Sequence, residues 1–202
     1  MPVSAPEPRS PLVQALKPGR HGAVGARQVT LRAYRRSLVQ LQARKGRAAD
    51  LATAVRQGLG LALPPPGRAE TSPTLAAIWI QPSAWLLCAP YLAEGDLARS
   101  VRAAVGSAGA VVDQTHGKSV LRLSGPTARA VLETGCRIDL HPRAFAPGQA
   151  AATPVGHIDC ILRQLDNAPS YELIVASTLA EAFVDWLLHA AAAYGCEVLP
   201  PD

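Results

Sequence analysis

The sequence predicts an α+β fold with mixed or antiparallel sheets and inserted helices. Periodic apolar residues along the 202-residue chain indicate about seven short strands and about four helices. The helices stand between pairs of strands, whereas a doubly wound parallel sheet requires strict alternation of strand and helix. The chain is long enough to bury a core without support from disulfides or metals.

The chain divides by composition near its start. Its first 25 residues contain five prolines and scattered charge, and their apolar residues follow no period. Such a composition is typical of an extended segment. We therefore expect a proline-rich arm over residues 1–25, lying along a neighbouring subunit, and a single α+β domain over residues 26–202. That domain is open to division into two interlocked subdomains, about 26–107 and about 108–202.

The first half of the domain contains strands on either side of one helix. Alternating apolar residues between positions 28 and 42 predict one or two strands, and a helix over residues 48–59 follows. The Gly- and Pro-rich residues 60–67 end that helix. Two short strands, residues 76–80 and 84–89, come next.

The middle of the chain predicts a helix and a second strand pair. The helix covers residues 94–105 and stops before Gly106. The strand pair covers residues 110–113 and 119–123. A tight turn is expected between them, in which Gly117 permits a positive φ.

The last third predicts two helices separated by strands. Pro126 is tolerated in the first turn of a helix that Gly135 ends. Strands are expected near residues 153–165 and 171–176. The final helix has a capping-box pattern over residues 178–181 and is expected to run to Tyr194.

Charge is unevenly distributed along the chain. The formal net charge is +5, yet residues 1–70 contain twelve Lys and Arg against three Asp and Glu. The basic stretch at residues 27–47 contains a single aromatic residue, Tyr34, and no helix-turn-helix or ribonucleoprotein-type motif. Nucleic acid is therefore disfavoured as a partner. Two interpretations of the basic stretch remain: a solvent-exposed face, or a contact with an acidic protein partner.

No signal for secretion or for a membrane is visible in the sequence. The longest apolar runs are shorter than the roughly 18–20 residues that span a bilayer. The start of the chain has no apolar region of the signal-peptide type. The four cysteines form no C-x-x-C pair, so free and mostly buried thiols are expected. A cytoplasmic protein without a membrane partner is the expectation.

Two apparent motifs do not carry their usual chemistry. Gly117-Lys118-Ser119 ends as a phosphate loop does, but that loop requires a glycine at position 112, which is Val. His157 and Cys160 supply only two metal ligands, as do Asp139 and His141, whereas a stable site requires three or four. We expect no metal site.

The stretch GCRIDLHPRAF, residues 135–145, contains the residue types of a thiol nucleophile with its base. In an extended segment side chains alternate, so Cys136 would point inward and away from His141. We weigh a structural turn first, an inter-subunit contact second and catalysis third. Asp139 is expected to accept backbone N–H groups in that turn. The candidate turn or contact residues are Arg137, Asp139, His141, Pro142 and Arg143.

Residues 118–145, KSVLRLSGPTARAVLETGCRIDLHPRAF, resemble the gamma subunit family of heterotetrameric sarcosine oxidase. Further similarity lies in RSPL at residues 9–12, IWIQPSAWLL at residues 78–87 and WLL at residues 186–188. The chain departs from the family at Ser83, where Asp is common, and at residues 161–165, which lack a Trp. These departures leave open whether the parent enzyme acts on sarcosine or on another N-methylated amine.

The resemblance implies a fold like the folate-binding domain of the glycine-cleavage T-protein. It also implies a small non-catalytic subunit of a flavoenzyme that demethylates sarcosine to glycine, passes the one-carbon unit to tetrahydrofolate and produces hydrogen peroxide. In that family the beta subunit carries FAD and FMN, the alpha subunit NAD and tetrahydrofolate, and the delta subunit zinc. The expected partners are thus the alpha, beta and delta subunits, and the expected role is assembly and stability.

No catalytic or cofactor-binding residue transfers from the family to this chain. Two alternatives remain at this point. One is a free-standing folate-binding or one-carbon-transfer protein, in which Asp113 or Asp139 would anchor the pterin. The other is the equivalent subunit of a related N-methyl amine oxidase or dehydrogenase.

Overall fold

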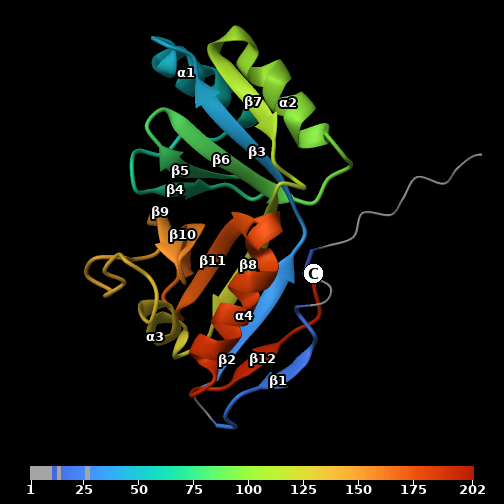
Figure 1. Ribbon diagram of the computed structural model, residues 1–202. Helices are drawn as coiled ribbons and strands as arrows, with labels where there is room; N and C mark the ends of the chain where they lie inside the picture. Colours follow the sequence, from blue (N-terminus) through green and yellow to red (C-terminus); the bar gives the residue numbers. More distant parts are fainter. Residues whose placement is uncertain (1–10, 13–14, 26–27) are drawn as a thin grey trace, which may run out of the picture.

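The computed structural model describes residues 11–12, 15–25 and 28–202. In this part of the chain, two sheets contain twelve strands, and four α-helices cover them (Figure 1). The expected α+β class is confirmed. All strand pairs are antiparallel except the pair of β12 with β2.

The larger sheet has seven strands and the smaller sheet five. In spatial order, the larger sheet consists of β1 (Gly19–His21), β12 (Cys196–Val198), β2 (Val29–Tyr34), β8 (Lys118–Ser124), β11 (Ser170–Ala176), β10 (Ile158–Asp166) and β9 (Ala150–Val155). The smaller sheet consists of β4 (Ala69–Thr71), β5 (Ala76–Gln81), β6 (Ala84–Pro90), β3 (Arg36–Ala43) and β7 (Gly109–Asp113). The helices are α1 (Ala48–Leu59), α2 (Asp96–Val105), α3 (Ala128–Glu133) and α4 (Ala180–Ala191).

The elements form four layers. Because side chains alternate along a strand, each sheet presents one apolar face to helices and the other to the second sheet. Helices α1 and α2 pack on the smaller sheet, and helices α3 and α4 pack on the larger one. The inner faces meet in a third cluster, built from Leu38, Ile78 and Leu86 of the smaller sheet and Val120 and Ile174 of the larger sheet.

The chain passes between the sheets twice, at Arg35 and at residues 114–117. The expectation that residues 110–113 and 119–123 form a strand pair is therefore wrong, because β7 pairs with β3 while β8 pairs with β2 and β11. Gly117 does not take a positive φ. Its N–H donates to the Gln114 carbonyl over 3.0 Å, as does the N–H of Lys118 over 3.1 Å, in a crossing turn and not in a hairpin.

The division into sheets differs from the subdomain boundary expected near residue 107. Strands β1 and β2 lie in the same sheet as the strands of the C-terminal half, so the chain before β3 belongs to the larger sheet. Residues 1–10 and 13–14 of the expected arm lie outside the described residues. The described remainder joins the domain: Leu12 and Leu16 are buried in its core, and residues 19–21 form the edge strand β1. A three-residue edge strand pairs through its backbone, which requires no side-chain period.

The expected strand near residues 153–165 is interrupted by a turn. Val155 and Ile158 pair directly, and the two residues between them, Gly156 and His157, have φ values of +57° and +66°. This is the geometry of a two-residue hairpin. A histidine at a left-handed position is uncommon and gives no clear turn signal in the sequence.

Helix boundaries agree with the sequence best where glycine ends the helix. Helix α1 covers the expected residues, and the N–H of the left-handed Gly60 donates to the Arg56 carbonyl. The capping box expected over residues 178–181 is not formed: a 3₁₀ turn, Ser177–Leu179, precedes α4, and no side chain caps its first turn. Helix α4 ends at Ala191, three residues before the expected position.

Candidate functional site

The segment after α3 lies against the β9–β10 hairpin. Cys136 forms an isolated bridge with Val155 of β9. The expected alternation is confirmed, because Leu140 is buried and Ile138 partly buried, whereas Arg137 is exposed. Three side chains of one polar face therefore point to solvent: Arg137, Asp139 and His141.

Hydrogen bonds fix the turn that presents this face. Asp139 Oδ1 accepts the N–H of His141 over 2.8 Å, as the sequence predicts. The His141 carbonyl then accepts the N–H of Phe145 over 2.9 Å. Phe145 is buried in the core of the larger sheet, so the far end of the turn is anchored. Pro142 and Arg143 between these points are exposed.

The Trp186 ring of α4 fixes the near end of this segment. A Cβ added to Gly135 or to Gly156 would overlap the Trp186 ring. Both residues must therefore lack a side chain for the loop, the hairpin and α4 to meet. Gly135 is consequently required by close approach, and Gly156 by close approach together with its positive φ.

The thiols in this region have the character of packed apolar groups. Burial raises the pKa of the Cys136 thiol, and it raises the pKa of the neighbouring Cys160 to about 12. Within the described residues no hydrogen bond joins Cys136 to His141. A thiol protonated at neutral pH is a poor nucleophile. The segment therefore has the geometry of a closed turn with an exposed polar face.

The other candidate ligands are spread over the molecule. His157 is exposed at the hairpin tip while Cys160 is buried. Among the described residues, no group of three or more His, Cys, Asp and Glu side chains gathers where a metal ion would bind. The carboxylates considered as pterin anchors both close local turns: Asp113 Oδ1 accepts the N–H of Thr115 over 2.9 Å, and Asp139 accepts that of His141.

The basic stretch becomes β2, β3 and the loop after them. Arg27 lies outside the described residues. Tyr34 stands between Arg32 and Arg36 in the sequence, and both guanidinium groups lie over its ring. Their central carbons are 5.6 Å and 4.7 Å from the ring centroid. Both also pair with Asp202, at 3.8 Å and 3.5 Å. Part of the basic charge is therefore neutralised by the end of the described chain.

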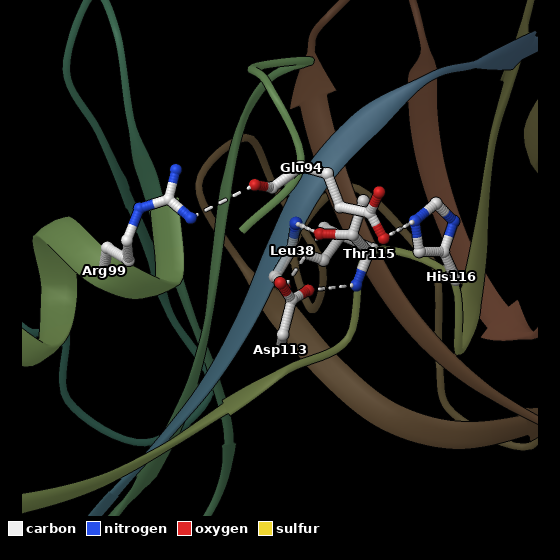
Figure 2. Close-up of polar contacts among 6 residues, drawn as sticks. All are labelled: Leu38, Glu94, Arg99, Asp113, Thr115 and His116. Carbon is white, nitrogen blue, oxygen red and sulfur yellow. Dashed lines mark hydrogen bonds and ion pairs between the residues drawn. The ribbon is translucent and has the colours of Figure 1, made fainter. Parts of the chain in front are cut away.

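A polar network holds the second crossing between the sheets (Figure 2). Thr115 Oγ1 accepts the N–H of Leu38 over 3.1 Å and lies 3.4 Å from the Leu38 carbonyl. His116 Nε2 lies 3.6 Å from a carboxylate oxygen of Glu94, which precedes α2. The network therefore joins the crossing to β3 and to the start of α2.

A row of charged residues crosses the inner face of the larger sheet. In the strand register, Arg32 of β2 faces Arg122 of β8, Arg122 faces Glu172 of β11, and Glu172 faces Arg163 of β10. Arg163 Nε donates to Glu172 Oε2 over 2.7 Å in an almost fully buried pair. The sequence analysis did not predict this row. The sequence nevertheless contains a sign of it, because one charged residue lies within each of the apolar runs ILRQL and YELIV.

The sequence and the fold of this chain both resemble those of known proteins. The profile of the sarcosine oxidase, gamma subunit family matches residues 45–193. The chain belongs to this family. The sarcosine oxidase subunit gamma of Arthrobacter sp. is 33% identical over 184 residues, which cover 91% of this chain and 88% of that protein. The subunit of the same name from Corynebacterium sp. strain U-96 is 32% identical over 169 residues, or 82% of this chain and 80% of that protein.

Solved structures agree with this membership of the gamma subunit family. A chain of the heterotetrameric sarcosine oxidase from Corynebacterium sp. U-96 has a TM-score of 0.79 and 30% identity, covering 93% of this chain and 96% of that one. The aminomethyltransferase T of the glycine cleavage system from Bartonella henselae has a TM-score of 0.58 at 18% identity, covering 81% of this chain and 46% of that one. The second likeness shows the fold alone and confirms the T-protein-like architecture. Within the described residues, no helix has the length and apolar character of a membrane span.

Proposed function

We propose that this chain is the gamma subunit of a heterotetrameric sarcosine oxidase-type enzyme and serves its assembly and stability. The observation that carries the proposal is the match of almost the whole chain to one subunit of a solved heterotetramer. Membership of the gamma subunit family supports it further.

The chemistry of the proposed enzyme belongs to its other subunits. The reaction is the oxidative demethylation of sarcosine to glycine, with transfer of the one-carbon unit to tetrahydrofolate and production of hydrogen peroxide. The alpha, beta and delta partners would carry NAD, tetrahydrofolate, FAD, FMN and zinc. The protonated thiols, buried at Cys160 and partly buried at Cys136, and the turn-closing carboxylates of this chain fit a role in packing.

The exposed turn at residues 137–143 is the proposed contact with a partner subunit. Its backbone is fixed before any partner arrives, because Asp139 closes it and Phe145 anchors it in the core. A fixed surface loses little conformational freedom on binding. Two exposed arginines, Arg137 and Arg143, stand ready for carboxylates on the partner.

The experiment is an affinity capture of the tagged chain from its native cells, with native mass and visible absorbance measured on the eluate. A yellow assembly that contains larger partner chains and oxidises sarcosine is the expected result. A colourless monomer would sink the proposal, and so would an assembly without flavin.

The fold favours one second candidate, a free-standing folate-binding protein, because the larger T-protein shares this architecture. The same eluate discriminates between the two. A monomer that binds tetrahydrofolate would establish the second candidate, whereas a flavin-containing assembly establishes the first.

A further inference from the structure

A cleft of about 210 Å³ opens between the two sheets, beyond the apolar cluster that joins them. One wall is formed by residues 71–76 and 88–90 of the smaller sheet. The opposite wall is formed by the charged row of the larger sheet, where Arg122, Glu172 and Arg163 stand side by side in register. The exposed turn at residues 137–143 contributes no residue to this cleft.

The lining of the cleft has an excess of positive charge. Three guanidinium groups line it, those of Arg36, Arg122 and Arg163, against the single carboxylate of Glu172. Low-dielectric walls around charges of one sign concentrate the field that an anion experiences. An anionic ligand is therefore favoured over a cationic one.

The three arginines differ in their freedom to meet a ligand. Arg163 is held, because its Nε donates to Glu172 over 2.7 Å and its Nη1 to Thr71 over 3.3 Å. Within the described residues, Arg163 Nη2 donates no hydrogen bond. It is also not one of the buried side-chain atoms that lack a hydrogen-bond partner. One corner of a rigid guanidinium is thus left for a ligand.

The other two arginines are held weakly. Arg122 Nη2 donates to Ser170 Oγ over 3.1 Å and pairs with Asp166 at 3.2 Å, and side-chain exposures of 37% and 42% leave the ion pair in contact with water. Arg36 pairs with Asp202 at 3.5 Å, with 24% and 44% of the two side chains exposed. Exposed pairs contribute little to stability, so both guanidinium groups can exchange these partners for a ligand in the cleft.

The shape of the cleft selects a small ligand. Its volume of about 210 Å³ lies below the roughly 300–1,000 Å³ that is typical of pockets for drug-sized ligands. The remaining lining includes the Tyr34 ring and the apolar side chains of Pro73, Leu75 and Leu165. Guanidinium forks match planar carboxylates in two parallel hydrogen bonds. We propose that this cleft binds a carboxylate group on a short aliphatic chain through Arg36, Arg122 and Arg163.

The test is isothermal titration of the purified full-length chain with glutarate at constant ionic strength. Saturable binding is expected, with sulfate and the neutral glutaramide binding at least tenfold more weakly. Arg122→Gln is expected to weaken glutarate binding at least tenfold. The matched control is Arg99→Gln on α2, which removes an exposed arginine that is not part of the lining and is expected to bind as the wild type does.

Absence of saturable glutarate binding at millimolar concentration would overturn the proposal, as would equal binding of sulfate or unchanged binding by Arg122→Gln. If Arg122→Gln loses its native circular dichroism spectrum, Arg36→Gln replaces it under the same criteria. Because the titration uses the chain alone, its failure is distinct from a failure of the capture experiment above.

A second titration, on the captured assembly, identifies the source of the carboxylate. Glutarate binding that persists in the assembly indicates a free small molecule. Binding that is present in the chain but lost in the assembly indicates that a partner carboxylate fills the cleft. Both results require the same guanidinium groups and are expected to be sensitive to Arg122→Gln.

Discussion

Arg163 and Glu172 face each other across β10 and β11, with Arg163 Nε 2.7 Å from Glu172 Oε2 and only 10% and 8% of the two side chains exposed. Removing two charges from water costs free energy that their attraction offsets only in good geometry. The pair also marks the register, because a slip of one strand by one residue would move its charge onto the apolar face beneath the helices and leave the other charge unpaired. It therefore links the alignment of the larger sheet to the wall of the cleft.

Glu172→Gln is expected to lower the free energy of unfolding by about 3–5 kcal/mol, because it leaves the Arg163 charge buried without its counter-ion. Urea denaturation of the full-length chain measures the loss. The matched control is Asp50→Asn, which breaks the exposed pair with Arg47 and is expected to cost about 0–1 kcal/mol. Equal losses in the two variants would contradict the importance of burial at this pair.

Gly135→Ala is expected to displace the Trp186 ring and to destabilise the chain by about 1–3 kcal/mol, since the added methyl group overlaps that ring. Near-ultraviolet circular dichroism reports the tryptophan environment, and thermal unfolding reports the stability. Gly25→Ala serves as the control, because its added Cβ meets nothing within 4 Å and its φ is not positive. An unchanged tryptophan signal in Gly135→Ala would show that the ring does not hold this loop.

Stability is expected to fall as pH rises above about 9. Burial raises the pKa of Cys160 from 9.0 to about 12, so between these values the unfolded thiol loses its proton while the folded one keeps it. Deprotonation thus favours the unfolded state by about 1.4 kcal/mol per pH unit. Below pH 9 the thiol is protonated in both states and contributes no pH dependence.

Cys160→Ala isolates this effect. Its unfolding free energy is expected to decline less steeply than that of the wild type between pH 9.5 and 11, by about 1.4 kcal/mol per pH unit. Cys136→Ala is the comparison, since that thiol is only partly buried and its removal should change the slope less. Identical slopes in wild type and Cys160→Ala would refute the raised pKa.

The sequence predicts the elements whose signals are local. Helix α1 begins and ends where apolar period and Gly60 indicate, and the alternation from Cys136 to Leu140 correctly places the thiol inward. The sequence does not predict strand pairing that is determined by tertiary packing. Residues 110–113 and 119–123 look like a hairpin, but their true partners are β3 and β2, which lie far away in the sequence.

The turn surface could be predicted and the cleft could not. Asp139 and Pro142 are only three positions apart in the sequence and belong to a common turn type. Arg36, Arg122 and Arg163 come from three separate strands, and only the order of the sheets brings them together. Lone charges within apolar strands are visible in the sequence, but their mutual register is set by long-range pairing.

Thr115→Val is expected to destabilise the chain by about 1–3 kcal/mol, because the N–H of Leu38 loses the hydroxyl acceptor at the crossing between the sheets. Thr115→Ser keeps the hydroxyl group and is expected to retain most of the stability. Urea denaturation compares the two. A loss in Thr115→Ser without a loss in Thr115→Val would indicate that the methyl group of Thr115, and not its hydroxyl, supports the crossing.

The exposed turn after α3 provides the last prediction. If it is the partner contact, the double variant Arg137→Glu and Arg143→Glu reverses two charges on a loop whose backbone is held by Asp139 and Phe145, so the chain should fold normally. We expect at least a tenfold loss of co-purifying flavin per chain, because like charges would face the partner's carboxylates. Arg99→Glu on α2 is the matched control and should retain the flavin. If the double variant keeps its circular dichroism spectrum and its flavin, the contact with the partner lies on another face.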